Sequence, residues 1–293
     1  MPGHDEIELG GKRFKHAMVD AGDVRLHTVS GGKGFPVLLM AGFPQSWYAW
    51  RRIMPILADH FYVVAIDLPG QGDSDKPVGG YDTQTAGDRV HALVKELGFE
   101  RYQIGAHDIG SWVAYPFVAR FSDEVGRLVL LDANIPGVTL KPTVEVGPNI
   151  WKSWHFFFHQ VPDVPEFLIT GRERSYIEWF FQRKTFNPAG TFSTADIDEY
   201  ERVYKQPGNL RGALAYYRAV LDDAEQNASL AAKKIETPIL ALGGDFGMSP
   251  DIYDAIKPLA THVEGGVIQN CGHYMPEEQP DEIAAKMIKF FRG

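Results

Sequence analysis

The sequence predicts an α/β fold in which helices cover both faces of a mainly parallel sheet and a helical cap is inserted into the chain. Strand-like apolar segments alternate with helical patterns up to about residue 134 and again from residue 226. One strand runs directly into a sharp turn and a helix. Residues 135–225 are instead aromatic-rich and helical in pattern. We therefore expect residues 1–134 and 226–293 to form one core, and residues 135–225 to form the cap.

The expected elements of the core follow from the periodicity of apolar residues. In the first part we expect strands at 24–30, 36–40, 61–67 and 128–131, and helices at 47–58 and 83–97. In the second part we expect strands at 238–242 and 262–268, and helices at 251–259 and 280–291. Strands that alternate with helices in this way pair in parallel, because each helix returns the chain to the same edge of the sheet.

Composition and charge exclude several classes of function. The net charge of -9 argues against a surface for nucleic acid or anionic membranes. A single cysteine, Cys271, allows neither an intrachain disulfide nor a cysteine-based zinc site. The charged start, Met1 to Glu6, lacks the apolar core of a signal peptide, and no apolar run is long enough to span a bilayer. We expect a cytoplasmic protein that binds neither nucleic acid nor membranes.

The segment 101–121 has the layout of a nucleophile elbow, the tight strand-to-helix turn of the α/β-hydrolase fold. Ala106 and Gly110 flank the turn, where close backbone approach leaves little room for a larger side chain. The nucleophile position holds Asp108 rather than serine or cysteine. A carboxylate is already ionised at neutral pH, so Asp108 can attack a saturated carbon without a base.

The nucleophile needs an acid and a histidine later in the chain. His273 lies in a loop after the last apolar strand, and we predict that it activates water against an ester formed on Asp108. Two carboxylates follow core strands and can orient this histidine: Asp132, which we favour, and Asp245. The backbone N–H groups of Phe43 and Ile109 are predicted to form the oxyanion hole.

The cap contains aromatic clusters around residues 153–158 and 215–218. Such clusters often pack a core, but histidine and tyrosine can also donate a proton or a hydrogen bond to a leaving oxygen or halide. We predict that Trp112, Trp154 and Phe156 contact substrate, which points to an apolar or aryl-bearing molecule.

These motifs resemble the epoxide hydrolase branch of the α/β-hydrolase family, in particular the Cif-type enzymes. The resemblance covers nearly the whole chain and rests on the elbow at 107–110, the cap segments 154–156 and 216–219, and the end motif 271–273. It implies that His155 and Tyr217 form the ring-opening pair, that Asp132 is the acid, and that a homodimer forms. Where the family usually has His-Gly before the oxyanion position, this chain has Ala41-Gly42.

Together these observations predict a cofactor-independent and metal-independent epoxide hydrolase that converts a small epoxide and water into a vicinal diol through an ester on Asp108. The first alternative is a hydrolytic dehalogenase with the same nucleophile. The chain also resembles fluoroacetate and haloalkane dehalogenases, but Ile109 and Trp112 stand where the former place arginines, and Ile109 where the latter place a halide-binding tryptophan. The second alternative is a non-catalytic, ligand-binding relic of the fold, against which the intact nucleophile, histidine and acid argue.

Overall fold

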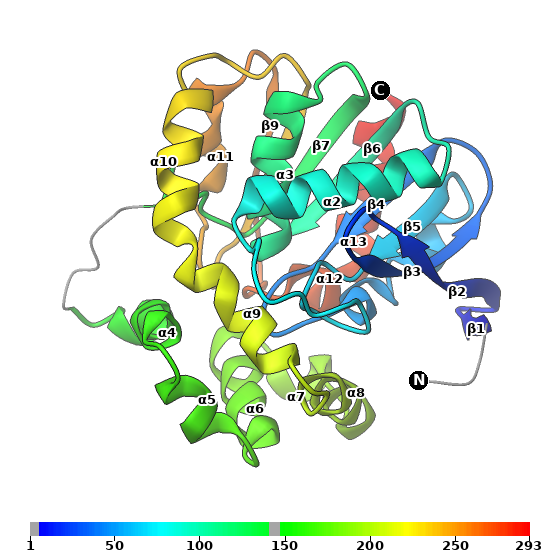
Figure 1. Cartoon of the computed structure of the whole chain (residues 1–293). Helices are drawn as coiled ribbons and strands as arrows, with labels where there is room; N and C mark the ends of the chain where they lie inside the picture. The colour runs from blue at the N-terminus through cyan, green and yellow to red at the C-terminus, as the bar shows by residue number, and fades with distance from the viewer. Residues whose placement is uncertain (1–5, 141–146) are drawn as a thin grey trace.

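A nine-stranded sheet forms the centre of the molecule (Figure 1). The computed structural model describes residues 6–140 and 147–293. Residues 1–5, which carry most of the segment judged too polar for a signal peptide, and residues 141–146 of the expected cap lie outside the described residues. The strand order is β1-β2-β3-β5-β4-β6-β7-β8-β9.

Most of the sheet is parallel. The strands are β1 (Glu6–Leu9), β2 (Lys12–Asp20), β3 (Arg25–Gly32), β4 (Pro36–Met40), β5 (Tyr62–Ile66), β6 (Tyr102–His107), β7 (Val125–Leu131), β8 (Ile239–Gly244) and β9 (Val263–Ile268). The neighbouring strands β5, β4, β6, β7, β8 and β9 pair in parallel. The strands β1, β2 and β3 add an antiparallel edge next to β5. Every residue of β6 is buried, as expected for a central parallel strand covered on both faces.

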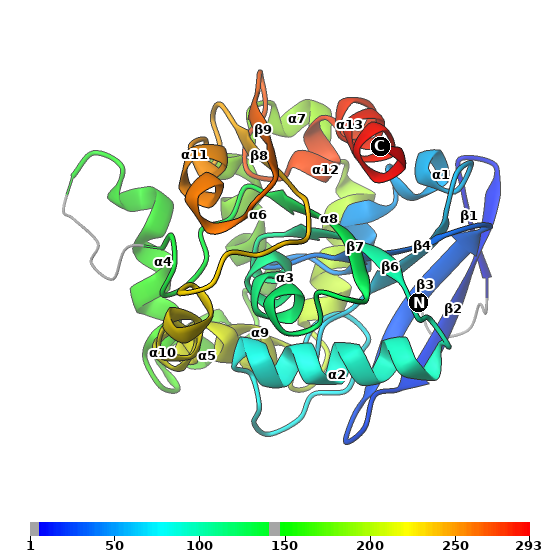
Figure 2. The same ribbon diagram turned by 90° about the horizontal axis from the view of Figure 1, so that it is seen from above.

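Helices cover both faces of the sheet (Figure 2). On one face lie α2 (Thr83–Glu96) and α3 (Ile109–Arg120), and on the other lie α1 (Met54–Leu57), α12 (Met275–Glu278) and α13 (Pro280–Arg292). The helix α11 (Ile252–Ile256), followed by the short turn η2 (Lys257–Leu259), packs beside β8 and β9. The predicted fold class, a mainly parallel sheet with flanking helices and a helical insertion, is therefore confirmed.

The insertion lies between β7 and β8. It contains α4 (Ile150–Gln160), α5 (Val164–Ile169), α6 (Glu173–Lys184), α7 (Pro188–Thr191), α8 (Thr194–Tyr204), α9 (Asn209–Arg218) and α10 (Val220–Leu230). Figure 1 shows α4 to α8 gathered at one end of the sheet, with α9 and α10 leading from them along the side of the core. We call α4 to α10 the cap. The helix α10 runs across the boundary predicted between residues 225 and 226, and it contacts α2 and α3 of the core.

The differences from the predicted elements have local causes. The segment predicted as one helix at 47–58 forms η1 (Trp47–Trp50) and then α1, because Pro55 has no N–H and sits in the first turn of a new helix. The strands β1 and β2 were not predicted. The strand β2 lies next to the edge of the sheet and carries lysine, arginine and histidine on both of its faces, so the apolar alternation of a half-buried strand is weak.

A buried group of charges fastens the cap to the core. Arg51, next to η1, donates hydrogen bonds to Asp196 of α8 at 2.6 Å and to Glu277 of α12 at 2.5 Å. Tyr200 of α8 donates a further hydrogen bond to Glu277. All four side chains are less than 10% exposed, so each charge depends on its partners rather than on water. This group holds α8 over the end of the sheet.

In the part of the chain that the structure describes, the helices are all too short or too polar to cross a membrane.

Replacing Arg51 by leucine should destabilise the protein strongly, because Glu277 would lose its hydrogen-bonded cation and keep only the Arg52 guanidinium at 3.9 Å. Breaking one side of such a buried pair costs roughly 3–5 kcal/mol of the free energy of unfolding. As a control, Lys205→Met removes a lysine that pairs with Glu201 on the surface of α8, and should change this free energy far less. Urea denaturation followed by circular dichroism measures the free energy of unfolding of both variants. An equal loss of this free energy in the two variants would contradict the anchoring role of Arg51.

Candidate active site

The turn between β6 and α3 holds Asp108 in a backbone conformation that most residues avoid. Its φ is 52° and its ψ is -125°. The turn is tight because α3 starts directly against the end of β4. A Cβ atom on Gly110 would lie 2.3 Å from the carbonyl oxygen of Met40, so only glycine fits there. The strained turn therefore presents the Asp108 carboxylate at the carboxyl end of the sheet, as a nucleophile elbow does.

Backbone donors hold one oxygen of this carboxylate. The N–H of Phe43 donates to Asp108 Oδ1 at 2.7 Å. A Cβ atom on Gly42 would lie 2.3 Å from that oxygen, so the preceding glycine is what lets the loop approach. Burial alone would raise the pKa of Asp108, but hydrogen bonds and charge from His273, together with the backbone N–H of Ile109, lower it to about 2. The Asp108 side chain is therefore ionised at neutral pH.

His273 connects this carboxylate to a second one. Its Nε2 lies 3.3 Å from Asp108 Oδ2, and its Nδ1 lies 2.7 Å from Asp132 Oδ2. Burial would lower the pKa of His273, yet the hydrogen bonds and charges of Asp108 and Asp132 outweigh burial and raise it above its ordinary value. The imidazole is thus a base whose proton affinity depends on two carboxylates.

Asp132 is fixed at the end of β7 by the backbone around it. It is fully buried, and its carboxylate accepts N–H donors from Gly244 at 3.2 Å, Met248 at 2.7 Å and Ser249 at 3.1 Å. These donors satisfy the lone pairs that His273 leaves free, so the buried carboxylate is not left without hydrogen-bond partners.

Asp245, the other acid considered from the sequence, has a different set of contacts. Its carboxylate accepts the backbone N–H groups of Asn270 at 3.1 Å and Cys271 at 3.0 Å. It shapes the loop that carries His273 but does not contact the imidazole within the described chain. His107 also supports this loop, since its Nε2 donates to the carbonyl oxygen of His273 at 2.7 Å.

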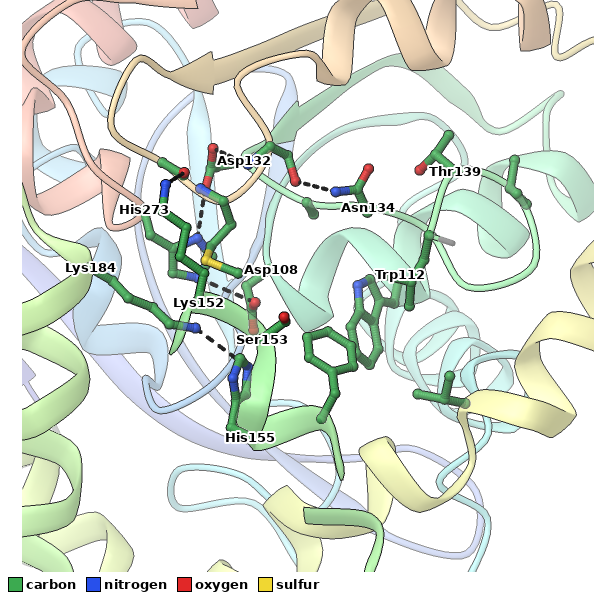
Figure 3. A pocket seen from close by; sticks show the side chains of 18 of the residues that line it. Asp108, Trp112, Asp132, Asn134, Thr139, Lys152, Ser153, His155, Lys184 and His273 are labelled. Atoms are coloured by element: carbon green, nitrogen blue, oxygen red, sulfur yellow. Dashed lines mark hydrogen bonds and ion pairs between the residues drawn. The ribbon is translucent and has the colours of Figure 1, made fainter. Parts of the chain in front are cut away.

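A cavity of about 860 Å³ opens between the core and the cap next to Asp108. Trp112 and Phe156 line it, with ring centroids 5.7 Å apart, and His155 lines it from α4 (Figure 3). The cavity also has a polar end, where Asn134 donates to Ser249 Oγ at 2.7 Å and Thr139 lies nearby. The cavity therefore has both apolar and polar walls.

Tyr217 of α9 packs among the rings around this cavity. Its ring centroid lies 5.6 Å from that of His155, 5.6 Å from that of Trp112 and 5.3 Å from that of Phe156. Burial, and then the negative charge of Asp108, raise the pKa of Tyr217 well above its ordinary value. Burial, and then the charge of Lys184, hold the pKa of His155 well below its ordinary value. At neutral pH both are uncharged groups with a hydrogen to donate.

Trp154 does not fit its predicted role. It precedes His155 on α4 and therefore points to another side of the helix, where its centroid lies 5.4 Å from that of Trp179 and 6.2 Å from that of Phe180. It borders a separate surface depression rather than the cavity that contains Asp108. The ring packs the cap helices together, which was the alternative explanation for the aromatic clusters.

Other side chains near Asp108 were not predicted from the sequence. Lys184, at the end of α6, lines the cavity, and its Nζ lies 3.4 Å from His155 Nε2. Tyr204 is buried, and the charge of Asp108 helps to raise its pKa. His159 lies one helical turn after His155, with its ring centroid 4.4 Å from that of Tyr217.

One group of residues in the described chain has the spacing of a metal site, away from Asp108. The ligand atoms of His27, Asp67 and Asp73 lie within 4.8 Å of one another. Protein partners already occupy the Asp67 oxygens: His27 Nδ1 at 2.7 Å and the N–H groups of Trp47 at 2.7 Å and Asp73 at 2.9 Å. These contacts account for the group as a hydrogen-bonded support for the loop after β5.

Residues 37–286 match the model of the alpha/beta hydrolase family. The chain belongs to this family.

Within the family, the chain is similar to enzymes of two kinds. It is 38% identical over 269 residues to a soluble epoxide hydrolase of Corynebacterium sp. (strain C12), which covers 91% of this chain and 93% of the relative. It is 30% identical over 287 residues to a fluoroacetate dehalogenase of Burkholderia sp., covering 94% of this chain and 93% of the relative. The crystal structure of Cfl2 from Burkholderia cenocepacia has 49% identity, a TM-score of 0.91 and 95% coverage of both chains. The predicted resemblance of this α/β-hydrolase to epoxide hydrolases and fluoroacetate dehalogenases is therefore confirmed.

The two candidate acids can be separated by their effect on His273. Asp132→Asn should lower the pKa of the His273 imidazole, because one of the two carboxylates that hold its proton becomes neutral. Asp245→Asn is the matched control and should leave this pKa nearly unchanged, since Asp245 contacts only backbone N–H groups of the loop. An NMR titration of the imidazole measures both variants. A larger shift in the Asp245 variant would contradict the assignment.

Proposed function

We propose that this α/β-hydrolase is an epoxide hydrolase that forms a covalent ester on Asp108 and releases a vicinal diol. The observation that carries the proposal is an ionised carboxylate at the elbow, facing a cavity that uncharged His155 lines, with uncharged Tyr217 packed against the His155 ring. The 38% identity to a soluble epoxide hydrolase supports it. A carboxylate that needs no base suits attack on a saturated carbon, and the cap donors suit an oxygen that leaves as an alkoxide.

In the first step, Asp108 Oδ2 attacks one carbon of the epoxide ring. The Oδ1 atom stays bound to the N–H of Phe43, so the carboxylate cannot rotate away from the cavity. The new C–O bond forms as the ring C–O bond breaks, and the electron pair moves to the departing oxygen. His155 and Tyr217 donate hydrogen bonds to that oxygen, and it gains a proton to become the first hydroxyl group of the product.

The first step prepares His273 for the second. Esterification removes the charge of Asp108, which is one of the two charges that raise the pKa of His273. The imidazole then releases its proton more readily and can accept one from water. Asp132 keeps Nδ1 protonated, so Nε2 is the nitrogen that faces the ester.

In the second step, water activated by His273 attacks the carboxyl carbon of Asp108. Negative charge builds up on the Asp108 oxygen that already accepts the N–H of Phe43, and the N–H of Ile109 also points to this carboxyl group. These donors are in place before the reaction, so they stabilise the tetrahedral intermediate without reorganisation. The ester then breaks, the diol leaves, and the carboxylate is restored.

The cavity walls indicate the kind of epoxide. Trp112 and Phe156 form an apolar wall beside the nucleophile, which suits an aryl or alkyl substituent. The polar end with Asn134 and Thr139 suits a substituent that accepts or donates hydrogen bonds. Turnover measured on a panel of terminal, internal and aryl epoxides would show which substituents the cavity prefers.

Hydrolysis in heavy-oxygen water tests the two-step scheme. With enzyme in excess over substrate, each active site turns over at most once. The label should then enter the Asp108 carboxylate and not the diol, because water attacks the ester carbon rather than the substrate carbon. Digestion and mass spectrometry locate the label. Label that enters only the diol would contradict an ester intermediate, and the absence of any turnover on the epoxide panel would contradict the proposed activity.

A second candidate, hydrolytic dehalogenation, is favoured by the 30% identity to a fluoroacetate dehalogenase. Here Asp108 would displace a halide, and the hydrogens of His155 and Tyr217 would bind it. Ile109 and Trp112 are uncharged at the positions where fluoroacetate dehalogenases place arginines, so the carboxylate of a haloacid would depend on Lys152 and Lys184 of the same cavity. We expect fluoride release from fluoroacetate, measured with a fluoride electrode, to be at least tenfold slower than diol formation from an aryl epoxide. Faster fluoride release would reverse the order of the candidates.

A further inference from the structure

Lys184 is a buried lysine that the two-step scheme leaves without a role. It ends α6, is only 4% exposed and lines the cavity next to Asp108. In the described chain it forms no ion pair with a carboxylate. Its Nζ lies 3.4 Å from His155 Nε2 and 5.0 Å from the ring centroid of Phe180. Burying an ammonium group without a counter-ion is costly, so this position needs an explanation beyond packing.

The contact with His155 decides which nitrogen of the imidazole carries hydrogen. When Lys184 is protonated, its ammonium group can only donate, so it then occupies the lone pair of His155 Nε2. The hydrogen of the neutral ring is then on Nδ1. That nitrogen is buried and has no hydrogen-bond partner among the residues described. Because His155 lines the cavity, the oxygen of a bound epoxide would supply the acceptor that this nitrogen lacks.

His155 cannot store a proton for this reaction by itself. Burial, and then the charge of Lys184, keep its pKa well below 6.5, so the ring is neutral when substrate arrives. If neutral His155 gave up its Nδ1 hydrogen alone, a buried imidazolate would remain, which is strongly unfavourable. A second proton must reach Nε2 as the first one leaves Nδ1, and the group at Nε2 is the Lys184 ammonium.

On the basis of the proposed epoxide hydrolysis, we propose that Lys184 supplies, through His155, the proton that the departing epoxide oxygen receives. As the ring C–O bond breaks, the oxygen takes the Nδ1 proton of His155, and Nε2 takes a proton from Lys184, which becomes a neutral amine. Hydrolysis of the ester by water yields the carboxylate, the diol and one proton. That proton returns to Lys184, so each cycle consumes only epoxide and water.

The charges around Lys184 are consistent with a proton that can be given up. Burial is the largest influence and lowers its pKa to about 7, while the charges of Asp108 and Asp132 act in the opposite direction. Lys152, on α4, lowers the pKa further. His155 on α4 and His273 in its loop line the same cavity, and burial and then the charge of Lys184 lower the pKa of His159 on α4. Esterification of Asp108 removes one of the charges that hold the proton on Lys184, so transfer becomes easier as the ring opens.

The rate of ring opening can be measured by rapid-quench mass spectrometry. The intact protein is mixed with an aryl epoxide, and the growth of the protein–substrate adduct is followed over time. In the wild type, the rate of ring opening should fall as pH rises through about 7, because the protonated form of Lys184 is the donor. Asp108 stays ionised across this range, so it does not produce that fall. A rate that stays level or rises through this range would overturn the proposal, whatever the variants do.

Variants separate proton supply from the mere presence of a cation. Lys184→Met should open the ring roughly a hundredfold more slowly, with no fall above neutral pH. Lys184→Arg keeps a positive charge at Nε2 but cannot release its proton, so it should be slowed to a similar extent. Ring opening by either variant at the wild-type rate would overturn the proposal. The arginine variant keeps the test valid if the methionine variant does not fold.

Lys152→Met is the matched control, because it removes another lysine from the same cavity. Its Nζ donates to the carbonyl oxygen of Gly247 at 3.0 Å and does not contact His155. This variant should keep the fall in rate with pH, moved to higher pH, because one charge that lowers the pKa of Lys184 is gone. Loss of the fall in this variant would overturn the assignment to Lys184. Wild-type protein that turns over the epoxide without any adduct would instead contradict the proposed function itself.

Discussion

The contact of His273 with two carboxylates, Asp108 on one side and Asp132 on the other, is the interaction on which the site depends. It requires three loop segments to meet at the carboxyl end of one sheet, and the parallel strands β6, β7 and β9 bring them there. It also requires hydrogen-bond partners for the buried carboxylate of Asp132, and three backbone N–H groups donate to it. The strained turn at Asp108 and the two glycines that allow close backbone approach serve the same contact.

The charge on Asp108 links the two proposed chemical steps. While it is present, it raises the pKa of both His273 and Lys184. When it is converted to a neutral ester, both groups hold their protons less tightly. The base needed for hydrolysis and the acid needed for ring opening therefore respond to the same event. They also lie next to each other, because the N–H of His273 donates to the carbonyl oxygen of Lys184 at 2.8 Å. The cap supplies the acid side through α4, α6 and α9, and the core supplies the basic side, so the anchoring of α8 by Arg51 bears on the chemistry.

The core of the fold could be predicted from the sequence because buried parallel strands are continuous apolar runs, and because an elbow has a compact local signature around Asp108. The sequence could narrow the acid partner of His273 only to Asp132 and Asp245, since both follow core strands. Which of them reaches the imidazole depends on how the backbone turns after each strand. Lys184 could not be predicted. It stands after Gln182 and Arg183 at a helix end, where a basic residue ordinarily faces water and favours the helix dipole. The prediction that Trp154 contacts substrate did not fit the structure for a related reason: consecutive aromatic residues on a helix point in different directions.

The account has one central claim, that the Asp108 side chain is alkylated by substrate. Replacing His273 by glutamine leaves the nucleophile in place but removes the base for the second step. Incubating this variant with an aryl epoxide and digesting it for mass spectrometry should reveal one substrate mass added to the peptide that contains Asp108. An unmodified peptide, with diol still accumulating in the same sample, would contradict the claim.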